Sequence, residues 1–341
     1  MKKISRIFVI LSAAVVALTV VPYVIRLLTL KPERTPFTLY SCVVHDFTAL
    51  DHGSGREYRF IDRKGNVYDD SVQPLFYASI LASKGQFPDT LEGRAVTLEE
   101  AESNSLFVTS DPKDVCKTWP PVYLLMESVP ERLELQDPED AMVSRRDGIY
   151  VYRMDTNELL SAKTDSLNTM LREAGFVFPA RKFGGNPSHH KSYDEGYLVT
   201  DSEDKLYQIK QVGGLLQVRH FAQADGLGVR NVKITEFENH ATLGMLVTGD
   251  GHLAMLRPDG TVAVTEVPFC PEKEDFLLVG DLFYYTVKTT DSDYERFYAL
   301  DSQTYALVDT MTRALPAGGS GIPRIAFTSP DDSWVKPRLR R

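Results

Sequence analysis

The sequence predicts a mainly β protein with a few inserted helices (α+β), in which a propeller-like or repeated β-meander body follows one N-terminal transmembrane helix. Three observations predict this class: an uncharged amino-terminal stretch, two blocks of short strands that match in order, and a single strongly periodic helix within the body. A β-sandwich is the alternative fold, because short strands joined by tight turns are typical of both architectures.

The uncharged stretch runs from Ile7 to Ile25, and twelve of its nineteen residues are Ile, Leu, Val or Phe. A helix of this length, at about 1.5 Å per residue, extends over roughly 28 Å, close to the ~30 Å hydrocarbon core of a bilayer. A cleaved signal peptide is the main alternative. Its apolar region usually covers about 7–15 residues and ends at a small-residue site, which Pro22–Arg26 does not offer. The sequence therefore predicts an uncleaved signal anchor.

Basic residues flank this stretch on both sides, so the positive-inside rule favours one orientation only through the terminal amine, which places the amino end inside. A short leading segment before a long folded domain also suits a signal anchor. We therefore expect residues 1–36 to form a single-pass anchor with its juxtamembrane segment, and the body to lie outside the cytoplasmic membrane. The flanking basic residues are Lys2, Lys3 and Arg6 on one side and Arg26, Lys31 and Arg34 on the other.

The charge distribution argues against nucleic-acid binding. The chain has a formal net charge of −9, although its first 36 residues hold six Lys or Arg and one Glu, so the body is strongly acidic. An acidic body repels phosphate backbones, and no basic stripe interleaved with aromatic residues occurs in the sequence. Residues 331–341 form a short basic tail, which is either a solvated end or a contact for anionic lipid headgroups.

The three cysteines, Cys42, Cys116 and Cys270, are not arranged in a C-x-x-C motif. Zinc ribbons and thioredoxin-like redox sites are therefore not supported. In an oxidising compartment the three allow one disulfide and leave one thiol, and the sequence does not say which pair forms. We expect at least one of them to be a buried structural cysteine.

Residues 37–195 are predicted to form the mixed α+β part of the body. The clearest helix there covers Ser166–Ala174, because its apolar residues recur at i, i+3, i+4 and i+7 and Gly175 follows as a terminator. Asp165 or Ser166 is expected to cap it. The other expected elements are a strand at 37–40, a hairpin at 57–68 turning at 62–65, a helix around 74–83, a helix at 98–102 capped by Thr97 and Glu100, a loop at 110–121, and strands at 122–126 and 148–153.

Residues 196–330 are predicted to form the β-repeat part. The block that begins at Gly196 reads G-x-L-V-T, acidic turn, strand, glycine turn, strand, and the block that begins at Gly244 repeats this order. A looser third block covers 282–311. Strand groups that recur at about 40–50 residues are typical of propeller blades or of a repeated β-meander.

The stretch most like a functional site is the Gly184–Glu195 loop. Its His189, His190, Asp194 and Glu195 are weak candidate metal ligands, because imidazole and carboxylate groups bind transition metals. No helix fixes their spacing, so a solvent-exposed polar loop is the alternative, with the glycines and Asn186-Pro187 acting as turn formers. No other stretch supplies a set of catalytic residues or a cofactor fingerprint, and the sequence predicts no cofactor.

Several motifs make the chain resemble an uncharacterised family of bacterial membrane-anchored envelope proteins, a domain of unknown function. The resemblance implies an accessory protein of the cell envelope at the bacterial inner membrane, and it carries no catalytic residues over to this chain. A link to transport systems of the ABC type is a further implication, although the sequence contains no transporter motif. The motifs are Phe37–Ser41, Asp62–Tyr68, Gly175–Ala180, Gly185–Pro187 and Asp194–Tyr197.

These observations favour a non-enzymatic, membrane-tethered envelope protein that binds a partner protein or a ligand, for example as an accessory subunit of a membrane transport complex. The expected partner is another envelope or membrane protein. The alternative function is an extracytoplasmic hydrolase or metal-dependent enzyme that uses the Gly184–Glu195 loop. A purely structural spacer in an envelope complex is the third hypothesis.

Overall fold

The computed structural model describes residues 2–29, 35–51, 59–116, 120–129, 135–315, 325–327 and 337–339. The chain forms two compact units. The first comprises Met1–Pro36, Ser292–Glu295 and Arg313–Arg341, and the second comprises Phe37–Asp291 and Arg296–Thr312. The boundary at Pro36 coincides with the predicted end of the juxtamembrane segment. The predicted boundary between the mixed α+β part and the β-repeat part, at residues 195 and 196, lies inside the second unit.

The first unit contains helix α1 (Lys2–Thr29), which includes the uncharged stretch Ile7–Ile25. It also contains the antiparallel pair β24 (Ile325–Phe327) and β25 (Pro337–Leu339). Among the helices in the described residues, none combines the length and the apolar character needed to cross a membrane. Most of the predicted basic tail, residues 331–341, falls outside the described residues.

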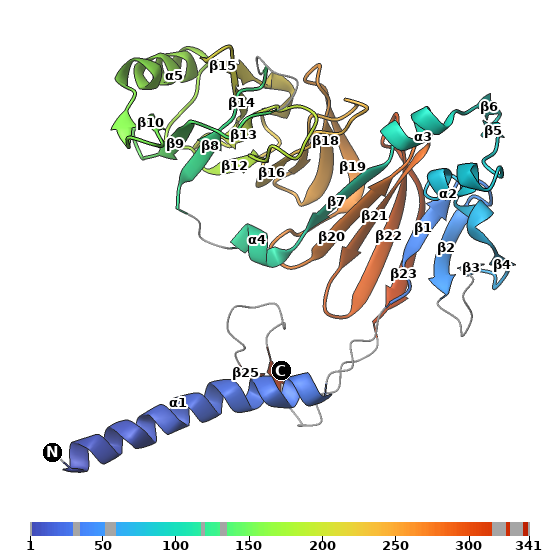
Figure 1. The fold of residues 1–341 in the computed structure, drawn as a ribbon, viewed down its shortest axis with the longest axis horizontal. Coiled ribbons are helices and arrows are strands. Elements are labelled where there is room, and N and C mark those ends of the chain that lie inside the picture. Colours follow the sequence, from blue (N-terminus) through green and yellow to red (C-terminus); the bar gives the residue numbers. More distant parts are fainter. Residues whose placement is uncertain are drawn as a thin grey trace. The chain divides into compact units, whose positions relative to one another are not determined.

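The second unit is mainly β, as predicted. Within the described residues its framework is five antiparallel sheets, and each is a meander whose strands follow one another along the chain (Figure 1). The sheets consist of β1–β4 (Thr38–Ser41, Asp46–Asp51, Arg59–Asp62, Val67–Tyr68), β8–β11 (Val122–Leu125, Asp140–Ser144, Ile149–Arg153, Glu158–Leu159), β12–β15 (Lys182–Gly185, Tyr197–Thr200, Leu206–Val212, Leu215–His220), β16–β19 (Asn231–Ile234, Gly244–Val247, His252–Leu256, Val262–Pro268) and β20–β23 (Asp275–Gly280, Tyr284–Thr290, Tyr294–Asp301, Leu307–Ala314).

One strand breaks the meander pattern. Strand β7 (Leu106–Ser110) pairs antiparallel with β20, from Leu106 opposite Gly280 to Ser110 opposite Phe276, and so makes the last sheet five-stranded. The two-residue strands β5 (Thr90–Leu91) and β6 (Arg94–Ala95) form a separate small ladder. Because β7 lies far earlier in the chain than β20, this pairing connects the β20–β23 sheet to the first half of the sequence.

The sheets stack face to face in the order β8–β11, β12–β15, β16–β19, β20–β23, β1–β4. Each neighbouring pair shares one cluster of buried apolar side chains. These four clusters are centred on Met142 and Ile209, on Leu198 and Leu246, on Met255 and Val287, and on Phe47 and Phe297. Consecutive meander sheets that stack in this way form a propeller-like body of repeated blades, not a sandwich of two sheets.

The predicted strand blocks are confirmed, and each has one more strand than the sequence predicted. Strands β12, β16 and β20 precede the blocks that begin at β13, β17 and β21. The prediction that Gly184 and Gly185 form a turn is wrong, because both lie in β12. A Cβ at Gly184 would lie 2.4 Å from the backbone oxygen of Val232 in β16. Glycine is therefore needed here for the close approach of two strands.

The short helices α2 (Ala78–Ser83), α3 (Leu98–Ser103) and α4 (Pro112–Cys116) lie between β4 and β8. The predicted capping box is confirmed, since Thr97 Oγ1 accepts from Glu100 N at 3.1 Å and Glu100 Oε2 accepts from Thr97 N at 3.1 Å. Two boundaries differ. The helix expected from residue 74 begins at 78, after the 3-10 turn Asp70–Val72, and the expected 110–121 loop contains α4.

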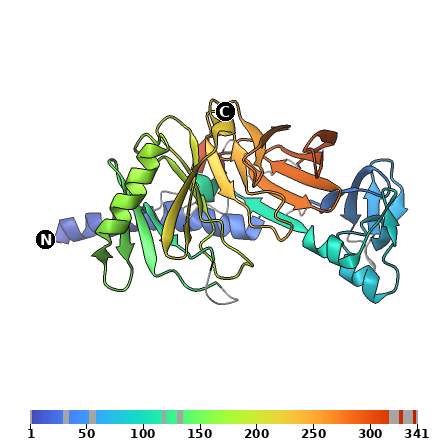
Figure 2. The same ribbon diagram turned by 90° about the horizontal axis from the view of Figure 1, so that it is seen from above.

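The longest helix of the body, α5 (Ser161–Glu173), confirms the predicted periodic helix but begins five residues earlier than Ser166. It packs against β10 and β15 (Figure 2). Its Leu167 and Leu171 are fully buried. The Asn168 side chain accepts from Ile149 N at 2.9 Å and donates to Ile149 O at 2.8 Å, so it pairs with the β10 backbone. Gly175, at a φ of +87°, follows the helix end as predicted.

Candidate functional site

The segment between β12 and β13 contains a buried ion cluster. Lys191 Nζ lies 2.6 Å from Asp194 Oδ1 and 2.6 Å from Glu236 Oε1, and the side chains of these three residues are only 6%, 2% and 2% exposed. Glu236 comes from the connection between β16 and β17. We call Lys191, Asp194 and Glu236 the Lys191 cluster. It joins the loops of two neighbouring sheets.

The two carboxylates of the Lys191 cluster are saturated with hydrogen bonds. Asp194 Oδ2 accepts from Ser128 Oγ at 2.8 Å and from Gly196 N at 3.0 Å. Glu236 accepts from Glu195 N at 2.9 Å and from Asn186 Nδ2 at 3.0 Å. Burial raises the pKa of Glu236, and its hydrogen bond from Lys191 opposes this rise. Because two carboxylates share one ammonium, the cluster acts as a structural clasp that depends on Lys191.

The two candidate histidines lie apart from this cluster, on the exposed part of the loop. Their rings are in contact, with centroids 4.0 Å apart. His189 Nδ1 lies 3.1 Å from Asp137 Oδ1, and both side chains are largely exposed, at 49% and 85%. The structure therefore pairs Asp194 with Lys191 and Glu195 with Lys210, while His189 contacts a carboxylate that the sequence did not single out.

Among the residues that the structure describes, no group of three or more His, Cys, Asp and Glu side chains is placed to hold a metal ion. Metal binding by His189 and His190 stays a prediction. Its sharpest test leaves Asp194 intact, because changing Asp194 would also break the Lys191 cluster. Alanine at both histidines should lower the zinc content of the purified protein if they bind metal, and should leave it unchanged if they do not.

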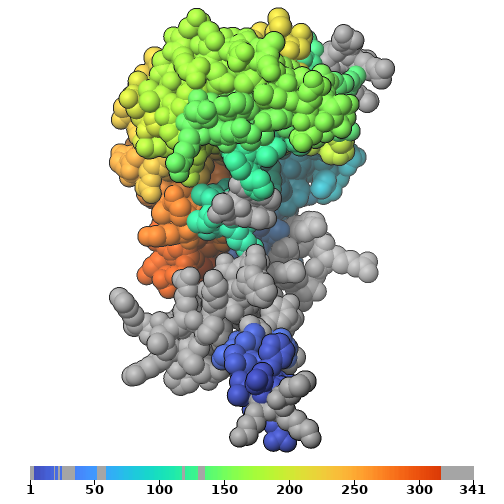
Figure 3. All heavy atoms as spheres, turned by 90° about the vertical axis from the view of Figure 1, so that its left-hand side faces the viewer, coloured from blue at the N-terminus to red at the C-terminus, as the bar shows by residue number. Residues whose placement is uncertain are grey.

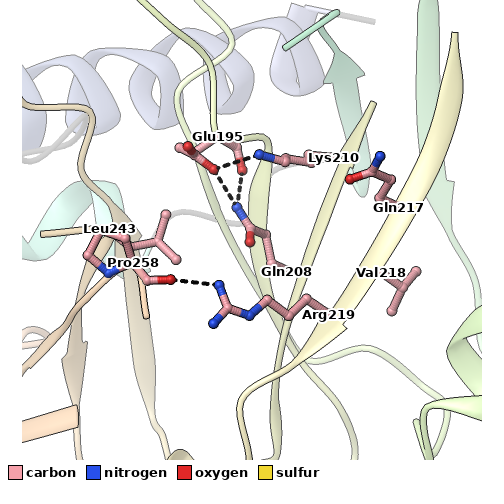
Figure 4. Close-up of a pocket in the computed structure, with 8 residues that line it drawn as sticks. All are labelled: Glu195, Gln208, Lys210, Gln217, Val218, Arg219, Leu243 and Pro258. Carbon is pink, nitrogen blue, oxygen red and sulfur yellow. Dashed lines mark hydrogen bonds and ion pairs between the residues drawn. The ribbon is translucent and has the colours of Figure 1, made fainter. Parts of the chain in front are cut away.

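Glu195, the last residue of the loop, lines a pocket of about 290 Å³ beside β14 and β15 (Figure 4). Its Oε2 accepts from Gln208 Nε2 at 2.8 Å and from Lys210 Nζ at 3.1 Å. Across the pocket, Arg219 Nη1 donates to the backbone oxygen of Pro258 at 2.7 Å. Gln217, Val218 and Leu243 complete the lining.

The groups in this pocket satisfy one another. The Glu195 carboxylate has both an amide and an ammonium donor, and the Arg219 guanidinium binds the backbone oxygens of Pro258 and Asp259. A ligand would have to replace these internal hydrogen bonds to bind, and would gain little net free energy from the exchange. We therefore interpret the pocket as a polar seam between two sheets.

A different feature is the outer face of the β8–β11 sheet, which is apolar and is not covered by any element among the described residues. Met142 and Val151 point to the opposite face, where α5 and the β12–β15 sheet bury them. On the outer face, cross-strand pairs place Val122 beside Val143 and Leu124 beside Ala141. These side chains line an open hollow of about 480 Å³ together with Arg145, Tyr152, Arg153, Met154 and Asn157.

We call these nine residues the open face. Val122 is 48% exposed and Met154 is 46% exposed. Each of the other four sheets contributes buried apolar residues to two of the clusters, whereas among the described residues the β8–β11 sheet contributes to one. In Figure 3 the green atoms, which belong to this sheet and to α5 and the segment after it, form much of the surface that faces the viewer. An apolar sheet face left without a neighbour is typical of an interaction surface.

Two arginines, Arg145 and Arg153, line the open face. Arg145 Nη2 donates to Tyr152 Oη at 2.9 Å, and the guanidinium lies over the Tyr150 ring, 4.6 Å from its centroid. Arg145 forms no ion pair with any described residue, while Arg153 is paired with Glu139 and Asp140. Besides the ion-paired Arg153, the open face therefore presents apolar side chains and one guanidinium, that of Arg145, held in place by two tyrosines.

The open face was not predicted from the sequence, although the sequence contains a signal for it. The runs Val122–Leu125 and Ile149–Tyr152 are apolar or aromatic at every position. A strand covered on one face alternates apolar with polar residues, and a continuous run indicates that both faces are to be buried. The second carboxylate of the Lys191 cluster left no comparable signal, because Glu236 lies 45 residues away from Lys191 along the chain.

Comparison with known proteins gives a family and a distant structural likeness. Residues 37–300 match the family described as Domain of unknown function (DUF4857). This match confirms the predicted resemblance to an uncharacterised domain of unknown function. One similar solved structure is the Dos1 propeller, which is 10% identical, with a TM-score of 0.30 over 52% of this chain and 45% of that chain. The chain thus spans less than half the length of that propeller chain. No curated protein matches the chain.

Proposed function

The chain belongs to the family described as Domain of unknown function (DUF4857), and we propose that it is a non-enzymatic, membrane-tethered envelope protein whose open face binds a partner protein. The single observation that carries this proposal is the apolar face of the β8–β11 sheet, which the described part of the chain leaves uncovered. When a partner covers an apolar sheet face that is otherwise in water, the binding free energy becomes more favourable by roughly 25 cal/mol per Å² of apolar surface removed from water.

The partner we propose is a protein surface with an apolar centre and a carboxylate opposite Arg145. Val122, Leu124 and Val143 would contact the apolar centre. Arg145 is suited to a carboxylate because its planar guanidinium donates in pairs and is already oriented by Tyr150 and Tyr152. The centre of a protein–protein interface typically contains few charged residues, and arginine is enriched among the residues there that contribute most to binding.

The membrane tether in this proposal rests on the sequence of Ile7–Ile25, which is uncharged and rich in Ile, Leu, Val and Phe. An anchor there would hold the body at the outer surface of the cytoplasmic membrane and raise its local concentration near other membrane proteins. We therefore propose a membrane or envelope protein as the partner, with the chain acting as an accessory subunit, for example of a transport complex.

The experiment that tests this function compares two aspartate variants in a mild-detergent pull-down of the tagged full-length chain. Val122→Asp places a carboxylate on the open face, and Val308→Asp places one on a valine of β23 that is exposed to nearly the same extent, 48% against 46%. Burying an unpaired carboxylate in an interface is unfavourable by several kcal/mol. We expect the Val122→Asp variant to lose at least 90% of the stoichiometric partner and the Val308→Asp variant to retain it.

Two outcomes contradict the proposal. Equal recovery of the partner with wild type and Val122→Asp would show that the open face is not the docking surface. A full-length protein that binds no partner at a stoichiometric level would remove the function itself. Circular dichroism of both variants serves as the folding control, because a single exposed substitution should change the free energy of unfolding by less than about 0.5 kcal/mol.

A further inference from the structure

The three cysteines differ sharply in their surroundings, and all three are free thiols in this structure. Cys42 is only 6% exposed and packs with Leu75, Ala78 and Val96 in an apolar cluster. Cys116 is exposed and Cys270 is half-buried. A thiol enclosed like Cys42 cannot meet a second cysteine without unpacking its cluster, so only Cys116 and Cys270 are left as a pair.

The fold brings Cys116 and Cys270 to the same residue. Cys116 Sγ lies 3.9 Å from Glu272 O, although 156 residues separate the two along the chain. Cys270 Sγ lies 3.5 Å from Glu272 Oε2. The turn that begins at Cys270 is well defined, because its carbonyl oxygen accepts from Lys273 N at 2.9 Å and from Glu274 N at 3.0 Å.

We propose that Cys116 and Cys270 form an intramolecular disulfide when the protein meets a disulfide oxidant, and that Cys42 remains a thiol. The two sulfurs contact different atoms of one residue, so the fold places both next to Glu272, and the bond forms once they approach to about 2.05 Å. This approach moves α4, which is five residues long and contains no buried residue. No core packing therefore resists it. This inference does not depend on the proposed partner.

The chemistry is thiol–disulfide exchange, and its atoms balance with oxidised glutathione as the oxidant. The Cys116 thiolate attacks one glutathione sulfur, forms a mixed disulfide and releases one glutathione thiolate. The Cys270 thiol then loses its proton, and its thiolate attacks Cys116 Sγ and displaces the second glutathione. Two protein thiols are oxidised, one glutathione disulfide is reduced, and the two protons end on the released thiols.

The order of these steps follows from the surroundings of each sulfur. Burial raises the pKa of Cys42 to about 12. Burial and the hydrogen bond to Glu272 also raise the pKa of Cys270. Because the thiolate is the attacking species, the exposed Cys116 is expected to react first, and Cys270 to resolve the mixed disulfide.

The test uses purified full-length protein treated with oxidised glutathione, then denatured, alkylated with iodoacetamide and mapped by mass spectrometry. We expect one alkylated thiol, at Cys42, and a cross-linked peptide pair that contains Cys116 and Cys270. Dithiothreitol should restore three alkylated thiols. Three alkylated thiols after oxidation, a stable glutathione adduct on Cys116, a cross-link to Cys42 or a covalent dimer would each overturn the inference.

Serine variants give matched controls. After oxidation, Cys42→Ser should have no alkylated thiol and should keep the cross-link, whereas Cys116→Ser and Cys270→Ser should lose it. The disulfide would close a long loop, so oxidation should raise the melting temperature by on the order of 5 °C, and this shift should vanish in Cys116→Ser. An equal shift in the wild type and Cys116→Ser would contradict the proposed bond.

Discussion

Replacing Lys191 by alanine is expected to lower the free energy of unfolding by about 3–5 kcal/mol, measured by urea denaturation at pH 7. The substitution leaves Asp194 and Glu236, each with a side chain only 2% exposed, without their shared ammonium. Breaking a buried ion pair by removing one partner is costly because the remaining charge stays in a poorly solvated place. Two carboxylates are affected here, so we expect an effect at the upper end of the range.

The matched control is Lys210→Ala. Lys210 also forms an ion pair, with Glu195 at 3.1 Å, but these side chains are 28% and 25% exposed. Partly solvated pairs contribute little, so this variant should lose less than about 1 kcal/mol. If both variants lost the same free energy of unfolding, burial of the Lys191 cluster would not be what determines its contribution to stability.

The loss in Lys191→Ala should also depend on pH. Burial already raises the pKa of Glu236 in the wild type, and its hydrogen bond from Lys191 works against that rise. Without Lys191 the pKa of this carboxyl should rise further. The folded variant then takes up a proton as the pH falls, which relieves the buried negative charge. The difference in unfolding free energy between variant and wild type should therefore be smaller at pH 5 than at pH 8.

Replacing Asp281 by asparagine is expected to stabilise the protein above pH 6, by up to about 3 kcal/mol. Burial raises the pKa of Asp281 from 3.8 to about 6. Its Oδ1 accepts from Phe283 N and Tyr284 N, both at 2.8 Å, and an asparagine oxygen can accept the same hydrogen bonds. The substitution thus removes a half-buried charge and keeps the turn.

The direction of the pH dependence follows from linkage. Because the pKa of Asp281 is raised on folding, its contribution to stability is fully present below about pH 3.8 and is lost as the pH rises through about 6. Asparagine does not titrate, so the free energy of unfolding of the variant should rise relative to that of the wild type across this pH window. The difference should persist at pH 7 and 8. Urea denaturation of both proteins from pH 4 to pH 8 measures the difference.

The control for this prediction is Asp259→Asn, a turn aspartate with the opposite shift. Hydrogen bonds from the side chain and backbone of Thr261 lower the pKa of Asp259, so its charged form is favoured in the folded state. Its replacement should destabilise the protein at pH 7. A stabilising effect of Asp259→Asn, or a destabilising effect of Asp281→Asn at pH 8, would contradict the assignment of these two carboxyls.

The repeated β-meander could be predicted because its evidence is local. A turn at Gly249–Gly251 or Pro258–Gly260 fixes a hairpin through the conformational freedom of a few neighbouring residues, and the blocks repeat in order. The first strand of each blade was missed for the same reason. Strand β12 contains Gly184 and Gly185, which indicate a turn locally. In the structure Gly184 allows the close approach to β16, and Gly185 leaves room for the Tyr197 ring of β13.

Long-range contacts explain the rest of what the sequence did not predict. Strand β7 completes a sheet whose other strands begin at Asp275, and no local pattern indicates that pairing. Helix α5 begins at Ser161, before the apolar periodicity starts, because Thr164 binds the backbone of Val151 in β10. The Lys191 cluster likewise depends on Glu236, from another sheet, so the loop alone indicated exposed histidines and not a buried lysine.

The most direct measurement of the central claim is site-specific photo-crosslinking in cells that make the protein naturally. A benzophenone amino acid at position 122 lies on the open face, and the same group at position 308 is a control of matched exposure, 48% against 46%. Binding at the open face predicts a discrete adduct with one protein from position 122 and none from position 308. No adduct at 122, or the same adduct at both positions, would contradict it.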